Sequence, residues 1–242
     1  MPFTLSHAAL VLPATYLPKK TYSLTGLVVG SFVPDFEYFI RMRDYSVYSH
    51  TWLGVLWFDL PLGIILAWLF HAVVRDALIE NLPKGLFARF AHVKGFNWTE
   101  HFRKNWAIVV VSIIIGTASH IFWDDFTHGE GYFVKHISFL REHTMFFGNF
   151  IPNYSFAQHL STLVGGAILW YAIWKMPKNE DVSQHPSKSY WINAVLISVL
   201  ILSLRLIAGL NYRSFDQLIV NAISAGLMAL IITPILRFRT VN

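Results

Sequence analysis

The sequence predicts an all-α, polytopic integral membrane protein, a helix bundle of about five to six transmembrane segments. Hydrophobic residues make up 55% of its 242 residues. Charged residues make up only 14%, against about 25% in a typical soluble domain. Several apolar runs also approach or exceed the roughly 20 residues that a membrane-spanning helix needs.

Two shorter apolar segments precede the first long run. Residues 4–17 form the first, which Thr4 or Ser6 is placed to cap, and a Pro-Lys-Lys sequence ends it. Residues 24–33 form the second, which is long enough for a half-helix or a tilted span. Pro34 follows, and Asp35 stands where a new helix would start.

The longer apolar runs predict transmembrane helices. They are 52–74, 106–123, 160–174 (beginning nearer Phe156 if it is to cross fully), 190–210 and 218–236. With no internal repeat, the chain is interpreted as one membrane domain, 1–242. Residues 1–165 carry its polar motifs, and 190–236 contribute two further spans.

Basic residues are unevenly distributed among the connecting segments. Residues 75–105 contain six lysines and arginines, whereas 124–158 contain only Lys135 and Arg141. The positive-inside rule therefore places 75–105, 175–189 and the C-terminus in the cytoplasm, with 124–158 and 211–217 outside. The basic residues between 19 and 43 favour an inward-facing N-terminal region instead, so its topology stays open.

Composition also limits the chemistry and the partners. Because cysteine is absent, a metal site would use His, Asp, Glu or backbone ligands, which suit zinc, manganese, iron or magnesium. The net charge of +5 is explained by basic cytoplasmic loops beside anionic lipid, so we expect a lipid bilayer as partner and no nucleic acid. The first residues lack a basic n-region, so no cleavable signal peptide is expected.

The most informative motif is the pair His120 and Asp124, at the end of an apolar run. Residues four apart share one face of a helix, so both side chains are placed to bind one metal ion. Ionisable groups are costly to bury in a membrane and indicate a functional site. In the predicted topology, His50, Gln158 and His159 also lie at the outer ends of their spans.

Several more histidines and aspartates are candidate ligands, because imidazole nitrogen and carboxylate oxygen bind divalent metals. In chain order the candidates are His7, Asp35, His50, His120 and Asp124, followed by Asp125, His128 and His159. A bridging carboxylate can hold paired ions about 3.5–4 Å apart. Structural alternatives are a helix N-cap for Asp35, an interfacial position for His50 and a hydrogen-bonded pair at the helix end for His120 and Asp124.

These motifs together resemble a known family. They are Met1-Pro2-Phe3-Thr4-Leu5-Ser6-His7, Gly30-Ser31-Phe32-Val33-Pro34-Asp35, Ser49-His50-Thr51 and Gly116-Thr117-Ala118-Ser119-His120 with Asp124 and Thr127-His128. Over about residues 1–165 the chain resembles the domain of unknown function 4184 family of bacterial membrane proteins. Its motif order is similar to membrane-bound metal-dependent hydrolases and, through them, to zinc-dependent phospholipase C.

The resemblance implies a ligand set. One metal would be held by Asp35, His50, His120 and Asp124, and a second by His7 with Asp124 as the bridge. The expected metal is zinc, with manganese or iron as alternatives. The later histidines and the glutamate of the soluble enzymes have no match in spacing here, so a mononuclear or dinuclear site is expected.

The function expected from these features is hydrolysis of a phosphoester or ester in a lipid-like substrate by metal-activated water. Asp125 or His128 would act as general acid or base. We expect a multi-pass protein of the bacterial inner (cytoplasmic) membrane, with the site on the non-cytoplasmic side. The alternatives are a transporter or metal or proton pathway, which the lack of visible inverted repeats disfavours, and a non-catalytic scaffold with a structural metal.

Overall fold

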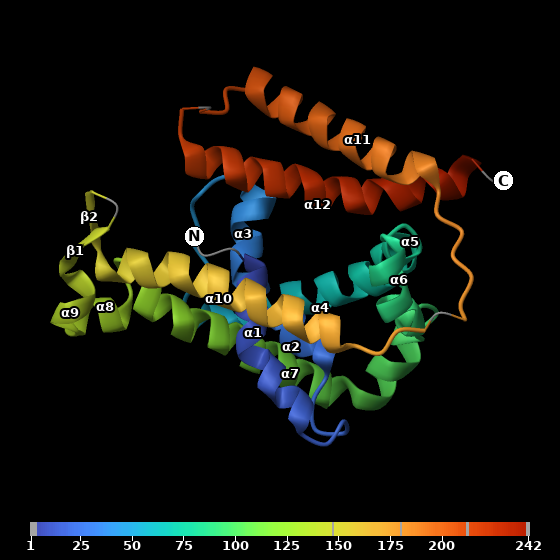
Figure 1. Cartoon of the computed structure of the whole chain (residues 1–242), viewed down its shortest axis with the longest axis horizontal. Coiled ribbons are helices and arrows are strands. Elements are labelled where there is room, and N and C mark those ends of the chain that lie inside the picture. Colours follow the sequence, from blue (N-terminus) through green and yellow to red (C-terminus); the bar gives the residue numbers. More distant parts are fainter. Residues whose placement is uncertain (1–3, 147, 180, 212, 241–242) are drawn as a thin grey trace. The chain divides into compact units, whose positions relative to one another are not determined.

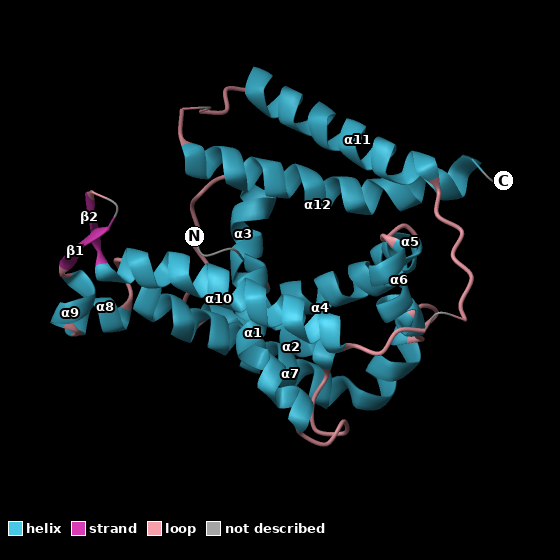
Figure 2. Ribbon diagram, viewed as in Figure 1, coloured by secondary structure: helices cyan, strands magenta, loops and turns pink. Residues whose placement is uncertain are grey.

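The computed structural model describes residues 4–146, 148–179, 181–211 and 213–240, so Met1, Pro2 and Phe3 of the first motif lie outside the described residues. The described chain is mostly helical, with two short strands (Figures 1 and 2). It forms two compact units. Unit 1 comprises Met1–Asp35, Tyr48–Ile64 and Asn105–Trp174; unit 2 comprises Phe36–Val47, Ile65–Lys104 and Lys175–Asn242.

Unit 1 begins with short helical pieces. They are η1 (Thr4–His7), α1 (Ala8–Val11), η2 (Leu12–Tyr16), α2 (Leu24–Gly30) and the first turn of α3 (Val33–Arg41). α2 has seven residues, which is too short to cross a bilayer, so the segment 24–33 contains a half-helix and not a tilted span. Asp35 lies in the first turn of α3, as predicted.

The prediction that Thr4 or Ser6 caps the first helix is wrong. The N-cap residue of α1 is His7, and it makes no side-chain capping bond. The hydroxyl of Thr4 donates instead to Asp35, and that of Ser6 donates to the carbonyl of Thr162. Both hydroxyls therefore join segments that are distant in the sequence.

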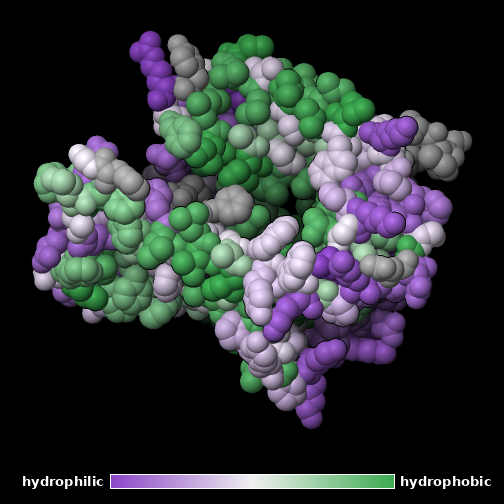
Figure 3. Space-filling model, viewed as in Figure 1, coloured by the Kyte–Doolittle hydropathy of each residue, from purple (hydrophilic) through white to green (hydrophobic). Residues whose placement is uncertain are grey.

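Five helices of the described chain are long and apolar enough to cross a membrane, which indicates a multi-pass membrane protein. They are Val55–Glu80, Trp98–His136, Asn153–Lys175, Lys188–Ile207 and Phe215–Leu236. Each overlaps one of the apolar runs, and the third begins even earlier than Phe156. Exposed Ile192, Val195 and Val199 give α11 (Lys188–Ile207) an apolar outer face (Figure 3).

The first two candidate spans are not uniform α-helices. The first consists of a π-helix, η3 (Val55–Asp59), then α4 (Leu60–Leu69), a second π-helix, η4 (Phe70–Val74), and α5 (Arg75–Glu80). Between it and α7 (Trp98–Thr127) lie α6 (Lys84–Phe90) and η5 (Ala91–Val93). Segment 75–105, predicted only as a connection, is therefore largely helical. α7 is kinked at Asn105, where φ is −126°.

The all-α prediction is wrong for one segment of unit 1. After α8 (Tyr132–His136) and α9 (Ser138–Arg141), β1 (His143–Phe146) pairs antiparallel with β2 (Asn149–Pro152). Both strands are rich in β-branched and aromatic residues, which favour extended backbone. Gly148, with φ of 80°, supplies the left-handed conformation between them. α10 (Asn153–Lys175) follows directly.

Close contact between α2 and α7 positions the candidate site. A Cβ atom on Gly30 would lie 2.3 Å from the carbonyl oxygen of Ile113, and one on Gly116 would lie 2.3 Å from that of Leu27. Small residues at such a crossing let helix backbones touch. The hydroxyl of Thr117 also donates to the carbonyl of Gly30, at 3.3 Å. The residues after α2 are therefore held against the second half of α7.

Unit 2 contains α11, packed along α12 (Phe215–Thr240). Arg205 of α11 donates to Oδ1 of Asn221 at 3.1 Å, and both side chains donate to the carbonyl of Met42. These bonds assign Arg205 a structural role within the unit. Segment 175–187 is also bound to segment 80–88, because the amide of Gln184 donates to the carbonyl of Glu80 at 2.9 Å.

Candidate metal centre

All five predicted metal-binding side chains converge within unit 1. They come from η1 (His7), the first turn of α3 (Asp35), the turn before η3 (His50) and α7 (His120 and Asp124). His120 is fully buried, His7, Asp35 and Asp124 are at most 9% exposed, and His50 is half-buried. Segments separated by more than a hundred residues thus contribute to one buried cluster.

The cluster consists of two overlapping groups that could each hold a metal ion. One is His7, His120 and Asp124, and the other is Asp35, His50 and His120. Within each group the ligand atoms lie within 4.8 Å of one another. His120 is common to both groups, and Asp124 Oδ2 also lies 3.5 Å from Nε2 of His50, so the groups are contiguous.

The distances within the cluster fit metal ligands better than hydrogen bonds. Nε2 of His120 lies 3.2 Å from Oδ2 of Asp124 and 3.7 Å from Oδ1 of Asp35. A charge-assisted N–H···O bond is about 2.7–2.9 Å long. Ligands at about 2.0–2.2 Å from a tetrahedral zinc ion lie about 3.3–3.6 Å apart. The side chains are therefore spaced closely enough that each group could hold a metal ion.

The orientation of His120 leaves one ring nitrogen for a ligand. Nδ1 lies 2.8 Å from the carbonyl oxygen of Ser31, and a carbonyl only accepts, so Nδ1 carries the proton of that bond. Nε2 then faces the carboxylates of Asp35 and Asp124 and has no hydrogen-bond partner among the described residues. A metal-binding imidazole usually donates its other N–H to a carbonyl or carboxylate in this way.

His7 is a buried imidazole with two unsatisfied nitrogens. Its ring stacks on that of His120, with centroids 3.8 Å apart. Within the described part of the chain, neither of its nitrogens has a hydrogen-bond partner. Burial lowers the pKa of His7 to about 4. The ring is therefore neutral at neutral pH, the state in which imidazole binds metals.

A tight turn holds His50. Its φ is 57°, a left-handed conformation that is uncommon outside glycine but enriched in histidine, asparagine and aspartate. Nδ1 of His50 lies 3.0 Å from the hydroxyl of Ser49. The end of the turn packs against its start, because a Cβ atom on Gly54 would lie only 2.1 Å from the carbonyl oxygen of Tyr48. Unusual backbone conformations of this kind tend to occur at functional sites.

The residues predicted as acid or base lie in different places. Nδ1 of His128 is 3.5 Å from Oδ1 of Asp124, and its Nε2 is 3.2 Å from the amide nitrogen of Gln158. Asp125 points to another side of α7, where its Oδ1 accepts the backbone N–H of Tyr132. His159 is exposed on α10. Among the described residues, His128 is therefore the one of these three candidates that lies beside the metal-binding groups, through Asp124.

Sequence reasoning missed the residues that orient the ligands. The hydroxyl of Thr4 donates to Oδ2 of Asp35 at 2.6 Å, and the carbonyl of Ser31 accepts from His120. Thr4 and Ser31 both lie inside the motifs that the chain shares with the family, and this is the sequence signal for them. Their role depends on contacts between distant segments, which a local pattern does not reveal.

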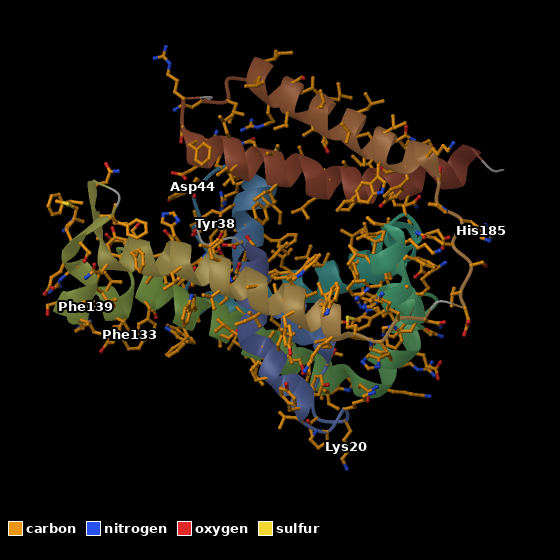
Figure 4. The ribbon with its side chains drawn as sticks, viewed as in Figure 1. Lys20, Tyr38, Asp44, Phe133, Phe139 and His185 are labelled. Atoms are coloured by element: carbon orange, nitrogen blue, oxygen red, sulfur yellow. The ribbon has the colours of Figure 1, made fainter. Side chains whose placement is uncertain are left out.

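Two clefts flank the cluster. The first, of about 170 Å³, reaches His7 and is lined by residues of η1, α1, α7 and α10. The second, of about 470 Å³, reaches His50 and is lined by residues of α7 and α8 together with Trp52. Phe133 of its wall is labelled in Figure 4. The two linings share no residue, so each cleft approaches the cluster through a different histidine.

Comparison with known families identifies the chain's relatives. A family described as "Domain of unknown function (DUF4184)" matches residues 1–235. The chain belongs to this family. The DUF4184 match extends beyond residues 1–165 and includes the last two candidate spans. No curated protein and no solved structure matches the chain. The likeness of the DUF4184 motifs to those of hydrolases stays a prediction.

Proposed function

We propose that this DUF4184 chain is a membrane-bound metal-dependent hydrolase that cleaves a phosphoester or ester in a lipid-like substrate. The observation that supports it most directly is the pair of overlapping His and Asp groups, buried and spaced as metal ligands. Burying so many ionisable groups without a compensating cation is costly. A divalent cation such as zinc, which nitrogen and oxygen donors suit, would offset that cost.

Each protein group has a distinct part in the proposed reaction. A bound divalent metal would supply a water with a pKa of about 7 and polarise the scissile group. Ser31 and Thr4 fix the orientation of His120 and Asp35. His128 lies beside Asp124, and its Nε2 would accept a proton once it releases the amide N–H of Gln158. Asp125 lines the larger cleft, where it would act on the leaving group.

The proposed location is the bacterial inner membrane, with the cluster on the non-cytoplasmic side. The basic segments 75–105 and 175–189 were assigned to one side by their charge. The backbone N–H of Asn179 donates to the carbonyl of Ala88 at 2.8 Å. This bond joins the two basic segments, which supports their placement on the same side of the membrane. His50, His120 and Asp124 lie at the opposite ends of their spans by the same charge rule.

The test compares two adjacent carboxylates. Detergent-purified protein is analysed for metal by mass spectrometry as wild type, Asp124→Ala and Asp125→Ala. We expect bound zinc, manganese or iron in wild type and Asp125→Ala, and its loss in Asp124→Ala. Hydrolysis of phosphoester and ester substrates should be lost with Asp124→Ala while the protein still inserts. Wild type that binds no divalent metal after reconstitution would refute the proposal.

A structural metal is the second candidate function. It is favoured by one observation, which is that the cluster joins the N-terminal segment to α3 and α7. A purely structural ion predicts that chelation lowers the melting temperature while metal-loaded protein hydrolyses no phosphoester or ester. A hydrolase predicts turnover that chelation abolishes and zinc restores. Turnover under metal control therefore separates the two functions.

A further inference from the structure

We infer that the smaller cleft binds an apolar chain of the substrate, which enters sideways from the lipid phase and ends at His7. The inference rests on the proposed function and specifies its substrate as an amphiphile. The cleft of about 170 Å³ lies between the N-terminal segment, α7 and α10. Its walls include Ala9, Leu10, Val164 and Ile168, and His7 is the ionisable residue in its lining.

The polar groups of the cleft offer little to a polar ligand. The hydroxyl of Ser6 already donates to the carbonyl of Thr162 at 3.0 Å, and that of Ser161 donates to the carbonyl of Gln158 at 2.9 Å. An ordered water needs about two to four polar partners, which such a lining does not provide. Hydrocarbon, by contrast, gains about 0.8 kcal/mol for each buried methylene group. The lining therefore suits an alkyl chain.

The mouth of the cleft lies on an apolar surface. Val164 is 49% exposed, Ile168 is 44% exposed and Leu10 is 39% exposed. The first two belong to α10, a candidate membrane span of which few residues are buried inside the protein. Such a surface would face lipid tails in a bilayer. A chain could therefore pass from the membrane into the cleft without crossing water.

The inner end of the cleft is the candidate metal centre. A Cβ atom on Gly165 would lie 2.8 Å from the Cβ atom of Ser6, so this glycine lets α10 contact the N-terminal segment beside His7. His7 is 2% exposed, its ring nitrogens are unsatisfied within the described chain, and Nε2 lies 3.6 Å from Oδ1 of Asp124. The apolar cleft therefore ends at a residue of the candidate metal centre.

The larger cleft determines the direction in which the substrate lies. Its wall carries the charged side chains Asp125, Glu130 and Lys135, and it reaches the cluster through His50. Successive residues of a helix point in directions about 100° apart. Phe122 and Asp125, which line the larger cleft, therefore leave α7 in other directions than Trp123, which lines the smaller cleft. The substrate would have its apolar chain beside His7 and its polar group beside His50, with the cleaved bond at the junction.

The experiment measures chain binding separately from turnover. Trp123 lines the cleft, and an alkylphosphonate with a brominated chain should quench its fluorescence. Subtracting the fluorescence of the Trp123→Phe variant gives the contribution of Trp123. The same alkylphosphonate without bromine gives the fluorescence change that does not come from quenching. Val164→Phe should fill the cleft and weaken this quenching by at least about tenfold. Leu163→Phe is the matched control, because Leu163 is the adjacent residue of α10, 71% exposed and outside the cleft lining.

The outcomes separate the inference from the proposed function. Quenching of Trp123 that Val164→Phe weakens and Leu163→Phe preserves supports the inference, whether or not the protein hydrolyses the substrates tried. Absent quenching, or equal effects of the two variants, overturns it even in a metal-dependent hydrolase. In an active protein, Val164→Phe should also raise KM for long-chain substrates by at least about tenfold, with metal content unchanged.

Discussion

Asp124 presents one carboxylate oxygen to His7 and the other to His120. Oδ1 lies 3.6 Å from Nε2 of His7, and Oδ2 lies 3.2 Å from Nε2 of His120. A carboxylate placed in this way would suit a bridging ligand between two metal ions. The relationship joins the two metal-binding groups, and it leads to the first prediction.

Replacing His7 with Phe should remove one ion and leave the other. Phe retains an aromatic ring to stack on His120 but has no nitrogen, so an ion held between His7 and Asp124 would lose a ligand. Nε2 of His120 has one lone pair and would serve the other ion, because Nδ1 donates to Ser31. The group of Asp35, His50 and His120 remains complete. Mass spectrometry of the purified variant should therefore show one equivalent of metal fewer than wild type. Equal metal content in the two proteins would mean that His7 binds no ion.

Replacing Gly30 with Ala should disrupt the contact between α2 and α7. The new Cβ atom would overlap the carbonyl oxygen of Ile113, so the helices must separate, at a cost of about 1–3 kcal/mol in the free energy of unfolding. Metal affinity should fall as well, because Ser31 and Asp35 follow α2 directly. Gly166→Ala is the control, since nothing lies within 4 Å of its Cβ position. Thermal unfolding with and without zinc measures both effects, and similar results for the two variants would contradict the prediction.

Substitutions of His50 should separate the backbone from the ring. Asn adopts the left-handed conformation readily, so His50→Asn should lose metal affinity while the metal-free protein unfolds at an unchanged temperature. A β-branched residue is strained at a φ of 57°. His50→Val should therefore lose metal affinity like His50→Asn, and its metal-free form should also lose about 1–2 kcal/mol in the free energy of unfolding. Metal titration and thermal unfolding of both variants test this. Equal stability of the two metal-free variants would show that the turn imposes no such strain.

Thr4 should act by orienting Asp35. Thr4→Val removes the hydroxyl that donates to Oδ2 of Asp35 and should lower metal affinity by about tenfold or more, as is typical for groups that orient a ligand. Thr4→Ser retains the hydroxyl and should restore most of the affinity. Competition with a chelator of known affinity gives both values. If the Ser variant were as weak as the Val variant, packing of the threonine methyl group would be responsible.

The candidate spans and the His120–Asp124 pair could be predicted because their signals are local. A long apolar run indicates a span wherever its neighbours lie, and residues four apart share a helix face in any α-helix. Segment 24–33 was ambiguous because its length fits both a half-helix and a tilted span. Hydropathy places 143–152 within a connection and does not predict the β-hairpin, although its Thr, Phe and Ile residues favour strands.

By itself the sequence determined the membrane-protein class, the approximate spans and the residue types available to bind a metal. Family resemblance grouped His7, Asp35 and His50 with His120, and the tertiary structure placed them side by side. Only the tertiary structure decided that Thr4 orients a ligand instead of capping a helix, and that separate clefts reach His7 and His50. The physical reason is that these features depend on the contact of backbones at Gly30 and Gly116, between segments about 90 residues apart. Hydropathy and helical periodicity describe one segment at a time and carry no information about such contacts.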